Sequence, residues 1–249
     1  MGLAGKGCVA CLSGLDSFAY AVQWAKRGFD VHPLIFHYGQ KGFKEVDVAV
    51  GLSMRLGFKK AVVIAVNGLR AIYKGTQLMD DAIGVQADYN PNIVVPLRNV
   101  LFMTVAAGYA LSLGVKYVLV GAHKGSVAPR ADTGEPEFPD CSLDTAHAVE
   151  NVVKVAHFPV GVDKVEIWSP LREGLSKSEN IRRGYDIVGD VLFHAWSCHV
   201  SGLYHCGMCE TCTSRHQAVV EAGILDKTEY KTHPIVADLC LKGVCGVKI

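Results

Sequence analysis

The sequence predicts an α/β protein, in which a doubly wound parallel sheet of Rossmann-like type is followed by a C-terminal zinc-binding subdomain. Short apolar runs alternate with segments of helical spacing along most of the 249 residues. Parallel strands need a crossover between them and are covered by helices on both faces, so their sequences are continuously apolar. Four cysteines crowd into residues 198–212 and predict the subdomain. We expect the division to fall between residues 1–190 and 191–249.

The expected elements follow one another in strand–helix order. The expected strands are short apolar runs, at 7–12, 31–36, 61–66, 117–121 and 164–168. The expected helices have apolar residues at helical spacing, at 18–27, 45–56, 98–113, 143–156 and from about 176 onward. Glycine follows each of the first three helices, and Ser176 with Glu179 forms a capping box at the start of the last one.

The composition is that of a globular protein with a sizeable core, because 50% of the residues are hydrophobic and 20% are charged. The net charge of +1 provides no extended basic surface, so we expect no direct contact with nucleic acid. Apolar stretches are strand-length or interrupted by Arg, Lys or Gly, so we expect no membrane span. The first ten residues lack the long apolar run of a secretory signal, and we expect a cytoplasmic location.

The segment Ser13-Gly14-Leu15-Asp16-Ser17 lies between the first expected strand and the first expected helix. A helix N-terminus presents free N–H groups and partial positive charge, which suits a phosphate group. Gly14 lets the backbone approach an anion, and the hydroxyls of Ser13 and Ser17 can donate to phosphoryl oxygens. Asp16 can hold Mg²⁺. An ordinary N-cap, in which Ser13 or Asp16 satisfies helix N–H groups without a ligand, explains the same residues equally well.

A second motif consists of four cysteines with the spacing C-x7-C-x2-C-x2-C: Cys198, Cys206, Cys209 and Cys212. Four thiolates at such spacing suit a tetrahedral Zn²⁺ ion, and four sulfurs leave no open position for water, so we expect a structural ion. Chance clustering of reduced thiols is the alternative. Nine cysteines is an odd number, which argues against a complete disulfide framework. Four other cysteines are expected as core residues or as unliganded thiols: Cys8, Cys11, Cys240 and Cys245.

Seven short motifs, in order along the chain, resemble those of the QueC family of 7-cyano-7-deazaguanine synthases. They are the loop at 13–17, Tyr38-Gly39-Gln40, Pro96-Leu97-Arg98-Asn99 with Leu101-Phe102, Gly121-Ala122-His123, Pro139-Asp140-Cys141, Leu175-Ser176-Lys177-Ser178-Glu179, and Trp196-Ser197-Cys198 before the other cysteines. The loop resembles the PP-loop of the N-type ATP pyrophosphatases, Ser-Gly-Gly-x-Asp-Ser, with Leu12-Ser13-Gly14 where that motif has Ser-Gly-Gly. The resemblance implies an adenine nucleotide alpha hydrolase-like fold.

The resemblance also implies a ligase of queuosine biosynthesis that forms C–N bonds. In that family ATP adenylates 7-carboxy-7-deazaguanine and releases pyrophosphate, ammonia displaces AMP to give an amide, and a second activation by ATP leads to the nitrile, preQ0. A carboxylate is a poor electrophile until its oxygen becomes part of a good leaving group. Mg²⁺ and backbone donors would stabilise charge on the phosphoryl oxygens. Members of the family often pair, so a homodimer is expected.

Carried over by position, the resemblance assigns three groups of site residues. Nucleotide binding falls to Ser13, Gly14, Leu15, Asp16, Ser17, Tyr38 and Gln40, substrate binding to Arg98, Asn99, His123 and Asp140, and catalysis to Asp16, Arg98 and Lys177. Arg98 can pair with a carboxylate or phosphate bidentately, and Asp140 can accept hydrogen bonds from the amino-pyrimidinone edge of a deazapurine. Plainer roles stay open: a helix-start charge for Arg98, a turn former for Asp140, a solvated Lys177 and a packed His123.

Three departures from the family pattern keep other functions open. The loop is shorter, His37 precedes Tyr38 where relatives have an acidic or polar residue, and a polar insert at 124–139 precedes Asp140. A loop of that length in a compact domain is more often functional than idle. One alternative is a paralogue that passes the activated deazapurine carboxylate to another amine, such as a protein. The other is a non-catalytic zinc-containing binding module.

Overall fold

The computed structural model describes residues 6–157 and 164–235, and the strands within them form one five-stranded sheet. The order across the sheet is β3-β2-β1-β4-β5, and every neighbouring pair is parallel. The strands are β1 (Gly7–Cys11), β2 (Asp30–His37), β3 (Val62–Ala65), β4 (Tyr117–Leu119) and β5 (Glu166–Trp168). The predicted doubly wound parallel sheet is confirmed.

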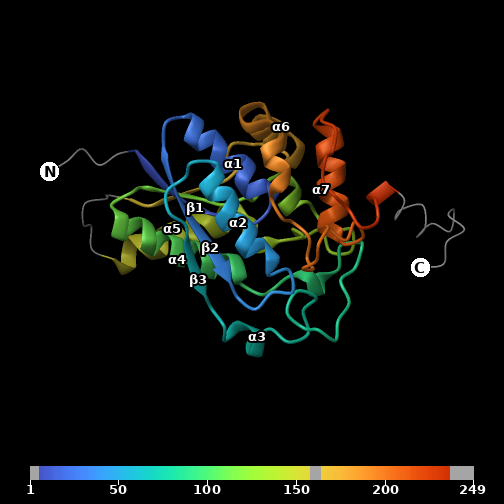
Figure 1. Ribbon diagram of the computed structural model, residues 1–249. Coiled ribbons are helices and arrows are strands. Elements are labelled where there is room, and N and C mark those ends of the chain that lie inside the picture. Colours follow the sequence, from blue (N-terminus) through green and yellow to red (C-terminus); the bar gives the residue numbers. More distant parts are fainter. Residues whose placement is uncertain (1–5, 158–163, 236–249) are drawn as a thin grey trace, which may run out of the picture.

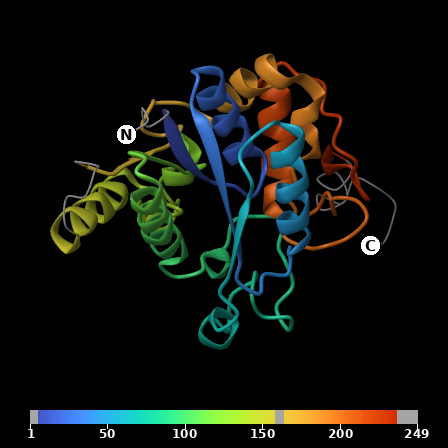
Figure 2. The same ribbon diagram turned by 60° about the vertical axis from the view of Figure 1, so that its left-hand side comes forward.

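Helices cover both faces of this sheet (Figures 1 and 2). One face carries α1 (Leu15–Lys26), α2 (Lys44–Arg55), α6 (Lys177–Val188) and α7 (Glu210–Glu221). The other carries α4 (Arg98–Leu113) and α5 (Leu143–Ala156), which are the green and yellow helices to one side of the strands in Figure 2. The remaining elements are α3 (Leu69–Ile72) and four 3-10 helices, η1 (Pro91–Ile93), η2 (Lys124–Val127), η3 (Pro139–Cys141) and η4 (Gly189–His194).

Alternate side chains of the central strand β1 enter two separate cores. Cys8 and Ala10 pack with α1 and α2, whereas Val9 packs with α4 and α5 on the opposite face. Successive side chains of a strand point to opposite faces, and here both faces are covered. This is why the sequence of β1 is apolar without alternation, and why Cys8 is a core residue as predicted.

The predicted helices lie where the sequence places them, with differences at their ends. Helix α1 begins at Leu15, three residues before its predicted start, because Gly14 is its N-cap. The loop at 13–17 therefore includes the first turn of the helix itself. The sequence does not predict the bounds of α7, because the cysteine-rich stretch before it has no apolar period. The capping box of Ser176 and Glu179 is present, and Cys240 and Cys245 lie outside the described residues.

One segment, Pro91–Leu113, is long and apolar enough to cross a membrane by length and composition alone. The expectation that every apolar stretch would be too short does not hold for it. Within this segment α4 packs against β1 and α5, with Met103 and Ala106 buried between them. Such packing is that of a core helix. Only 33% of the most apolar 18-residue window is buried, but most of its other apolar residues are partly buried against the same core. The exposed residues of α4 are Thr104, Gly108, Ser112 and Leu113.

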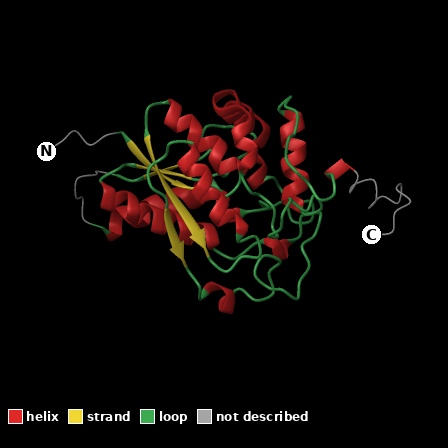
Figure 3. Cartoon of the chain, in the orientation of Figure 1, coloured by secondary structure: helices red, strands yellow, loops and turns green. Residues whose placement is uncertain are grey.

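The carboxyl ends of β1 and β4 meet where the strand order reverses, since the chain proceeds from β1 outward to β3 and then returns to β4 and β5. Ligands of open α/β sheets bind in the crevice at such a point. In Figure 3 the strand arrows point toward the end of the molecule at which the longer loops gather. The fold therefore places residues that follow β1 and β4 at a common site.

Candidate active site

A cavity of about 520 Å³ lies at the carboxyl ends of β1, β2 and β4. Its walls come from the loops after these strands, from the starts of α1, α4 and α6, and from one side of α7. Every residue that the sequence analysis assigns to nucleotide, substrate or catalysis lines this cavity except Leu15, whose side chain is buried in the core. The fold thus gathers motifs that are far apart in the sequence.

The turn after β1 leaves two backbone donors free. Ser17 Oγ closes the turn, because it accepts from the N–H of Ser13 at 3.0 Å and donates to the carbonyl of Gly14 at 2.9 Å. No hydrogen bond of the described chain uses the N–H groups of Asp16 and Ser17. A Cβ on Gly121, which follows β4, would lie 3.1 Å from the Ser17 nitrogen, so glycine keeps that donor open. Two free N–H groups at a helix N-terminus fit an anion.

Gly14 has an extended backbone, with φ −97° and ψ −168°, so its conformation does not require glycine. The missing side chain instead makes room for another segment of the chain. A Cβ on Gly14 would lie 3.1 Å from Ser197 Oγ and 3.4 Å from the carbonyl oxygen of Trp196. Ser197 Oγ also accepts the N–H of Leu15 at 3.2 Å. The close approach expected of an anion at Gly14 is therefore made by residues 196–197, and the N-cap alternative fails because the N-cap residue has no side chain.

Asp16 is the centre of a charged group at this end of the cavity. Its Oδ2 lies 3.4 Å from Lys177 Nζ and 4.0 Å from His123 Nε2. Its Oδ1 is buried without a hydrogen-bond partner in the described chain. Burial lowers the pKa of His123, although Asp16 opposes the shift, so the imidazole is neutral near pH 7. A buried carboxylate oxygen without a donor fits a cation such as Mg²⁺.

The opposite end of the cavity is formed by the starts of α4 and η3. Arg98 Nη1 donates to Tyr38 Oη at 3.2 Å, and the N–H of Asn99 donates to Asp140 Oδ2 at 3.1 Å. Burial alone would lower the pKa of Arg98, but Tyr38 and Asp140 raise it above its ordinary value. The guanidinium is therefore always charged. Arg98 is half-buried and Asp140 is buried, so neither is simply a surface charge or a turn former.

Leu97, directly before Arg98, is the one non-glycine residue of the described chain in the left-handed backbone region, with φ 57° and ψ 13°. This conformation costs a residue with a Cβ about 1–2 kcal/mol. The side chain gains little from burial in return, because the residue is 68% exposed. Strained positions of this kind gather at binding sites. The turn at Leu97 sets the direction in which α4 begins, and hence where Arg98 enters the cavity.

Gln40 supports the cavity wall from behind. Its Oε1 accepts the N–H of Tyr38 at 2.8 Å, and its Nε2 donates to the carbonyl of Phe36 at 3.1 Å and to Glu45 Oε1 at 2.9 Å. These bonds occupy its amide group and hold the loop after β2. Burial raises the pKa of Glu45, which shares this cluster. Gln40 therefore positions Tyr38 through bonds within the protein.

The polar insert at 124–139 forms part of the cavity wall. It begins with η2 and returns through a bridge between Pro129 and Pro136. Tyr89 Oη donates to the carbonyl of Glu137 at 2.7 Å, and the ring of Tyr89 packs edge-on against Phe138. Glu137 and Phe138 both line the cavity. The insert is thus fixed against the loop before α4 and contributes directly to the site.

Four of the five buried side-chain atoms that lack a hydrogen-bond partner in the described chain belong to residues of this cavity. They are Asp16 Oδ1, His123 Nδ1, Asp140 Oδ1 and His199 Nδ1. Folded proteins leave few buried polar atoms unpaired, and those few need an explanation. Their gathering at one cavity indicates a polar ligand with both donors and acceptors.

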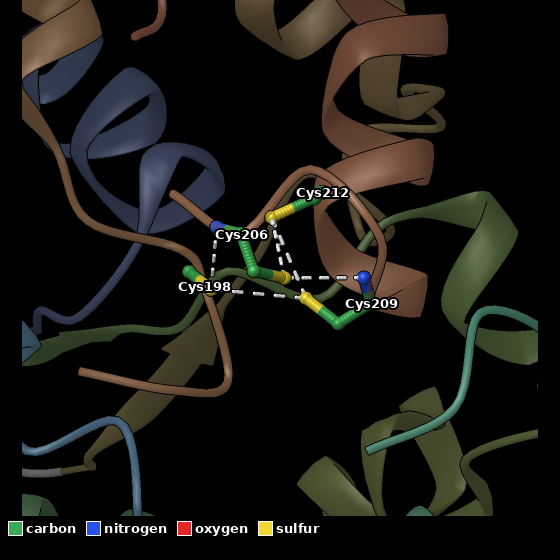
Figure 4. Close-up of side chains that lie close together, drawn as sticks. All are labelled: Cys198, Cys206, Cys209 and Cys212. Atoms are coloured by element: carbon green, nitrogen blue, oxygen red, sulfur yellow. Dashed lines mark hydrogen bonds between the residues drawn. The ribbon is translucent and has the colours of Figure 1, made fainter. Parts of the chain in front are cut away.

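The four predicted metal ligands converge at one edge of the cavity (Figure 4). The sulfur–sulfur distances are 3.9 Å for Cys198–Cys209, 3.9 Å for Cys206–Cys212 and 3.4 Å for Cys209–Cys212. Four sulfurs about 2.3 Å from a tetrahedral ion would lie about 3.8 Å apart. These separations exceed the length of a disulfide bond, about 2.05 Å. The cluster can therefore hold a metal ion such as zinc.

The two histidines beside the cluster serve other purposes. His205 Nε2 accepts the N–H of Ser197 at 3.2 Å, and its ring lies 4.2 Å from the ring of Trp196. His199 lines the cavity, where burial lowers its pKa to about 4. Neither replaces a cysteine in the sulfur cluster.

Sequence reasoning missed the contribution of α7. One side of this helix lines the cavity through residues three and four positions apart: Glu210, Thr211, Ser214, Gln217, Ala218 and Glu221. Lys177 Nζ donates to Ser214 Oγ at 2.8 Å, so α7 also holds a predicted catalytic residue. A polar stripe at helical spacing is the signal in the sequence, but polar stripes usually face solvent. Only the packing of α7 beside α6 turns it toward the site.

Comparison with known proteins gives one consistent family. Residues 7–223 match the model of the family described as queuosine biosynthesis protein QueC. A 7-cyano-7-deazaguanine synthase from Marinomonas sp. (strain MWYL1) is 32% identical over 232 residues, which cover 91% of this chain and 98% of that protein. A synthase of the same name from Psychromonas ingrahamii is 30% identical over 88% of this chain and 94% of its own length.

Solved structures show more distant similarity. NMN synthetase from Francisella tularensis is 15% identical with a TM-score of 0.43, over 89% of this chain and 79% of its own. A 4-thiouridine synthetase solved with RNA and ATP is 15% identical with a TM-score of 0.46, over 98% of this chain and 51% of its own. The assignment to a family therefore depends on the sequence matches.

Proposed function

The chain belongs to the family of the queuosine biosynthesis protein QueC, and from this premise we propose that it converts 7-carboxy-7-deazaguanine, ammonia and ATP into 7-cyano-7-deazaguanine. The observation that supports this best is a single cavity with two different ends. One end offers free backbone donors and the carboxylate of Asp16, which suit a nucleotide phosphate with its cation. The other offers Arg98 beside Asp140, which suits a carboxylated heterocycle.

The reaction consists of two activations by ATP. A carboxylate oxygen attacks the α-phosphorus and pyrophosphate leaves, and then ammonia attacks the acyl carbon and AMP leaves with loss of one proton. The resulting amide oxygen attacks the α-phosphorus of a second ATP, and pyrophosphate again leaves. Loss of AMP and of the remaining nitrogen protons gives the nitrile. None of these steps needs a nucleophile from the protein, but each needs the reactants to be held in the right orientation. A cavity with hydrogen-bond donors and charged side chains at both ends suits that task.

The nucleotide phosphates bind at the N-terminus of α1. The N–H groups of Asp16 and Ser17 donate to phosphoryl oxygens, and Lys177 contributes a positive charge close to Asp16. Asp16 would hold Mg²⁺, which would neutralise part of the charge on the triphosphate. His123, neutral near pH 7, can donate or accept a hydrogen bond without adding charge.

The deazapurine binds at the end of the cavity formed by α4 and η3. Arg98 pairs with the 7-carboxylate, since a guanidinium forms two parallel hydrogen bonds with a carboxylate. Asp140 uses its unpartnered Oδ1 to accept from the amino-pyrimidinone edge. The two contacts orient the carboxylate oxygen toward the α-phosphorus.

The four cysteines would hold zinc, and its task would be structural. Four sulfur ligands leave no site for water or substrate. The cluster fixes the start of α7, because Cys209 is the N-cap of that helix and Cys212 lies in its first turn. Bound zinc would therefore fix the part of α7 that carries Ser214 and Glu210.

The test is product formation by the purified protein. Continued release of AMP and pyrophosphate from ATP over many turnovers should require both 7-carboxy-7-deazaguanine and ammonia, and mass spectrometry should find the nitrile. An amide alone would mean that the second activation does not occur. Continued release of AMP with neither the amide nor the nitrile formed, or a deazapurine attached to the protein, would contradict the proposal and favour transfer to another amine.

The enzyme works as a homodimer, as the resemblance to a family whose members often pair implies. Light scattering after size exclusion should give a mass of twice 26.8 kDa, and a single-chain mass would contradict the pairing.

A further inference from the structure

Arg215 is a deeply buried charge that the reaction just described does not use. It lies on α7 and is 0% exposed. Its Nη1 donates to the carbonyl of Ala195 at 2.6 Å and to Ser197 Oγ at 3.0 Å, its Nη2 to the carbonyl of Phe193 at 3.0 Å, and its Nε to Thr228 Oγ1 at 3.0 Å. None of the ion pairs in the described chain includes it. A buried guanidinium held only by neutral oxygens is costly, which indicates a specific purpose.

Ser197 connects Arg215 to the loop at 13–17 through hydrogen bonds of its hydroxyl group. Its Oγ accepts one hydrogen bond from Arg215 and a second, at 3.2 Å, from the N–H of Leu15. A hydroxyl oxygen has two lone pairs and one proton, so two accepted bonds leave only the proton for use. No hydrogen bond within the described residues has the Ser197 hydroxyl as its donor, and Ser197 lines the cavity. The proton is therefore available to a ligand.

The free N–H groups of the loop lie next to this hydroxyl. Leu15, Asp16 and Ser17 are the first three residues of α1, and their N–H groups emerge from the same helix end. Ser197 Oγ occupies the first of these donors, while the other two are free. Gly14 permits the arrangement, because a Cβ there would lie 3.1 Å from Ser197 Oγ. The hydroxyl thus extends the row of donors toward the cavity.

We propose that Ser197 is a phosphate contact of the enzyme, whose hydroxyl donates to a β- or γ-phosphoryl oxygen of ATP, and that Arg215 is the positioning residue that holds it. This inference rests on the proposed use of ATP. A hydroxyl that accepts from a cation is a stronger donor, because linked hydrogen bonds polarise one another. Arg215 follows Cys212 by three residues on α7, so the cysteine cluster also fixes the position of Arg215 and hence of Ser197.

The test compares Ser197→Ala with Thr228→Val as a matched control. Both variants remove one acceptor of Arg215, but only Ser197 reaches the phosphate loop. Calorimetry with Mg²⁺ should show that Ser197→Ala weakens the binding of ATP and of pyrophosphate about 10- to 100-fold. Its affinity for AMP should stay within about twofold of the wild type, and Thr228→Val should stay within about twofold for all three ligands.

Equal losses for AMP and pyrophosphate, equal losses in the two variants, or no loss in Ser197→Ala would each overturn the inference. Failure of the wild-type protein to bind ATP would instead refute the proposed function, so the two failures are distinguishable. Zinc content and circular dichroism report folding. If Ser197→Ala does not fold, Ser197→Cys keeps a weak donor and should show a smaller loss of the same kind, confined to ATP and pyrophosphate.

Discussion

The cysteine cluster and the cavity share Cys198, yet they are built in opposite ways. In the cluster the sulfurs face one another, and backbone N–H groups of Cys206, Met208 and Cys209 donate to them at 3.3–3.4 Å. In the cavity, four buried polar atoms have no partner within the described chain. The polar groups of a structural metal site can find their partners during folding. The polar groups of an active site must stay without hydrogen-bond partners until the substrates bind.

The largest effect should follow from breaking the cluster. Cys209→Ser removes a sulfur ligand, while serine remains a good residue for the N-cap position of α7, so the expected loss is that of the metal site. We expect one bound zinc per chain to fall to near zero by elemental analysis, and the free energy of unfolding to fall by at least about 3 kcal/mol. Cys11→Ala, which removes a thiol outside the cluster, should keep the metal. Retention of zinc by Cys209→Ser would show that the four sulfurs do not act as one set.

The cavity should respond in the reverse manner, with loss of activity and no loss of stability. Asp16→Asn removes the carboxylate that faces Lys177 and His123. We expect kcat/KM to fall at least about 100-fold, because asparagine would hold Mg²⁺ more weakly and the charge on the phosphates would then not be neutralised. The unfolding midpoint should not decrease, since a buried unpartnered oxygen is no longer charged.

The control for that variant is Asp47→Asn, which neutralises an exposed acidic residue in the first turn of α2. Its kcat/KM should equal that of the wild type. A large loss of stability in Asp16→Asn would mean that Asp16 is a structural residue, and the contrast between the two regions would disappear.

A smaller and more selective effect should come from the far end of the cavity. Arg98→Lys keeps the charge but loses the planar pair of donors. We expect the KM for the carboxylated substrate to rise about 10-fold, while the KM for ATP changes less than about twofold. Steady-state kinetics with each substrate varied in turn provides the measurement. An equal rise in both constants would place Arg98 at the phosphates instead.

The smallest effect should be the pH dependence due to His123. Burial lowers its folded-state pKa below the unfolded value, so the unfolded chain binds more protons between those two pKa values. The stabilising contribution of the neutral imidazole is present above the unfolded pKa and is lost as the pH falls toward the folded one. The unfolding midpoint of His123→Asn should therefore decline less than that of the wild type between pH 7 and pH 5. Parallel curves would contradict the burial of an unpartnered imidazole.

The sheet could be predicted because each strand is a short apolar run and each helix has a clear period. Asp16, Lys177 and His123 were assigned by position in family motifs, and the fold brings their side chains together. The contribution of α7 could not be predicted, because its polar residues would look the same on a solvated helix. Arg215 was missed for a related reason, since a charge is expected at the surface.

One consequence of the turn at Leu97 concerns protein engineering. Glycine adopts a φ of 57° without strain, which favours Leu97→Gly by about 1 kcal/mol, but it also gives the unfolded chain more freedom, which costs about as much. The two contributions nearly cancel. Substitution at position 97 should therefore change how freely the start of α4, with Arg98, can move, while the melting temperature stays the same.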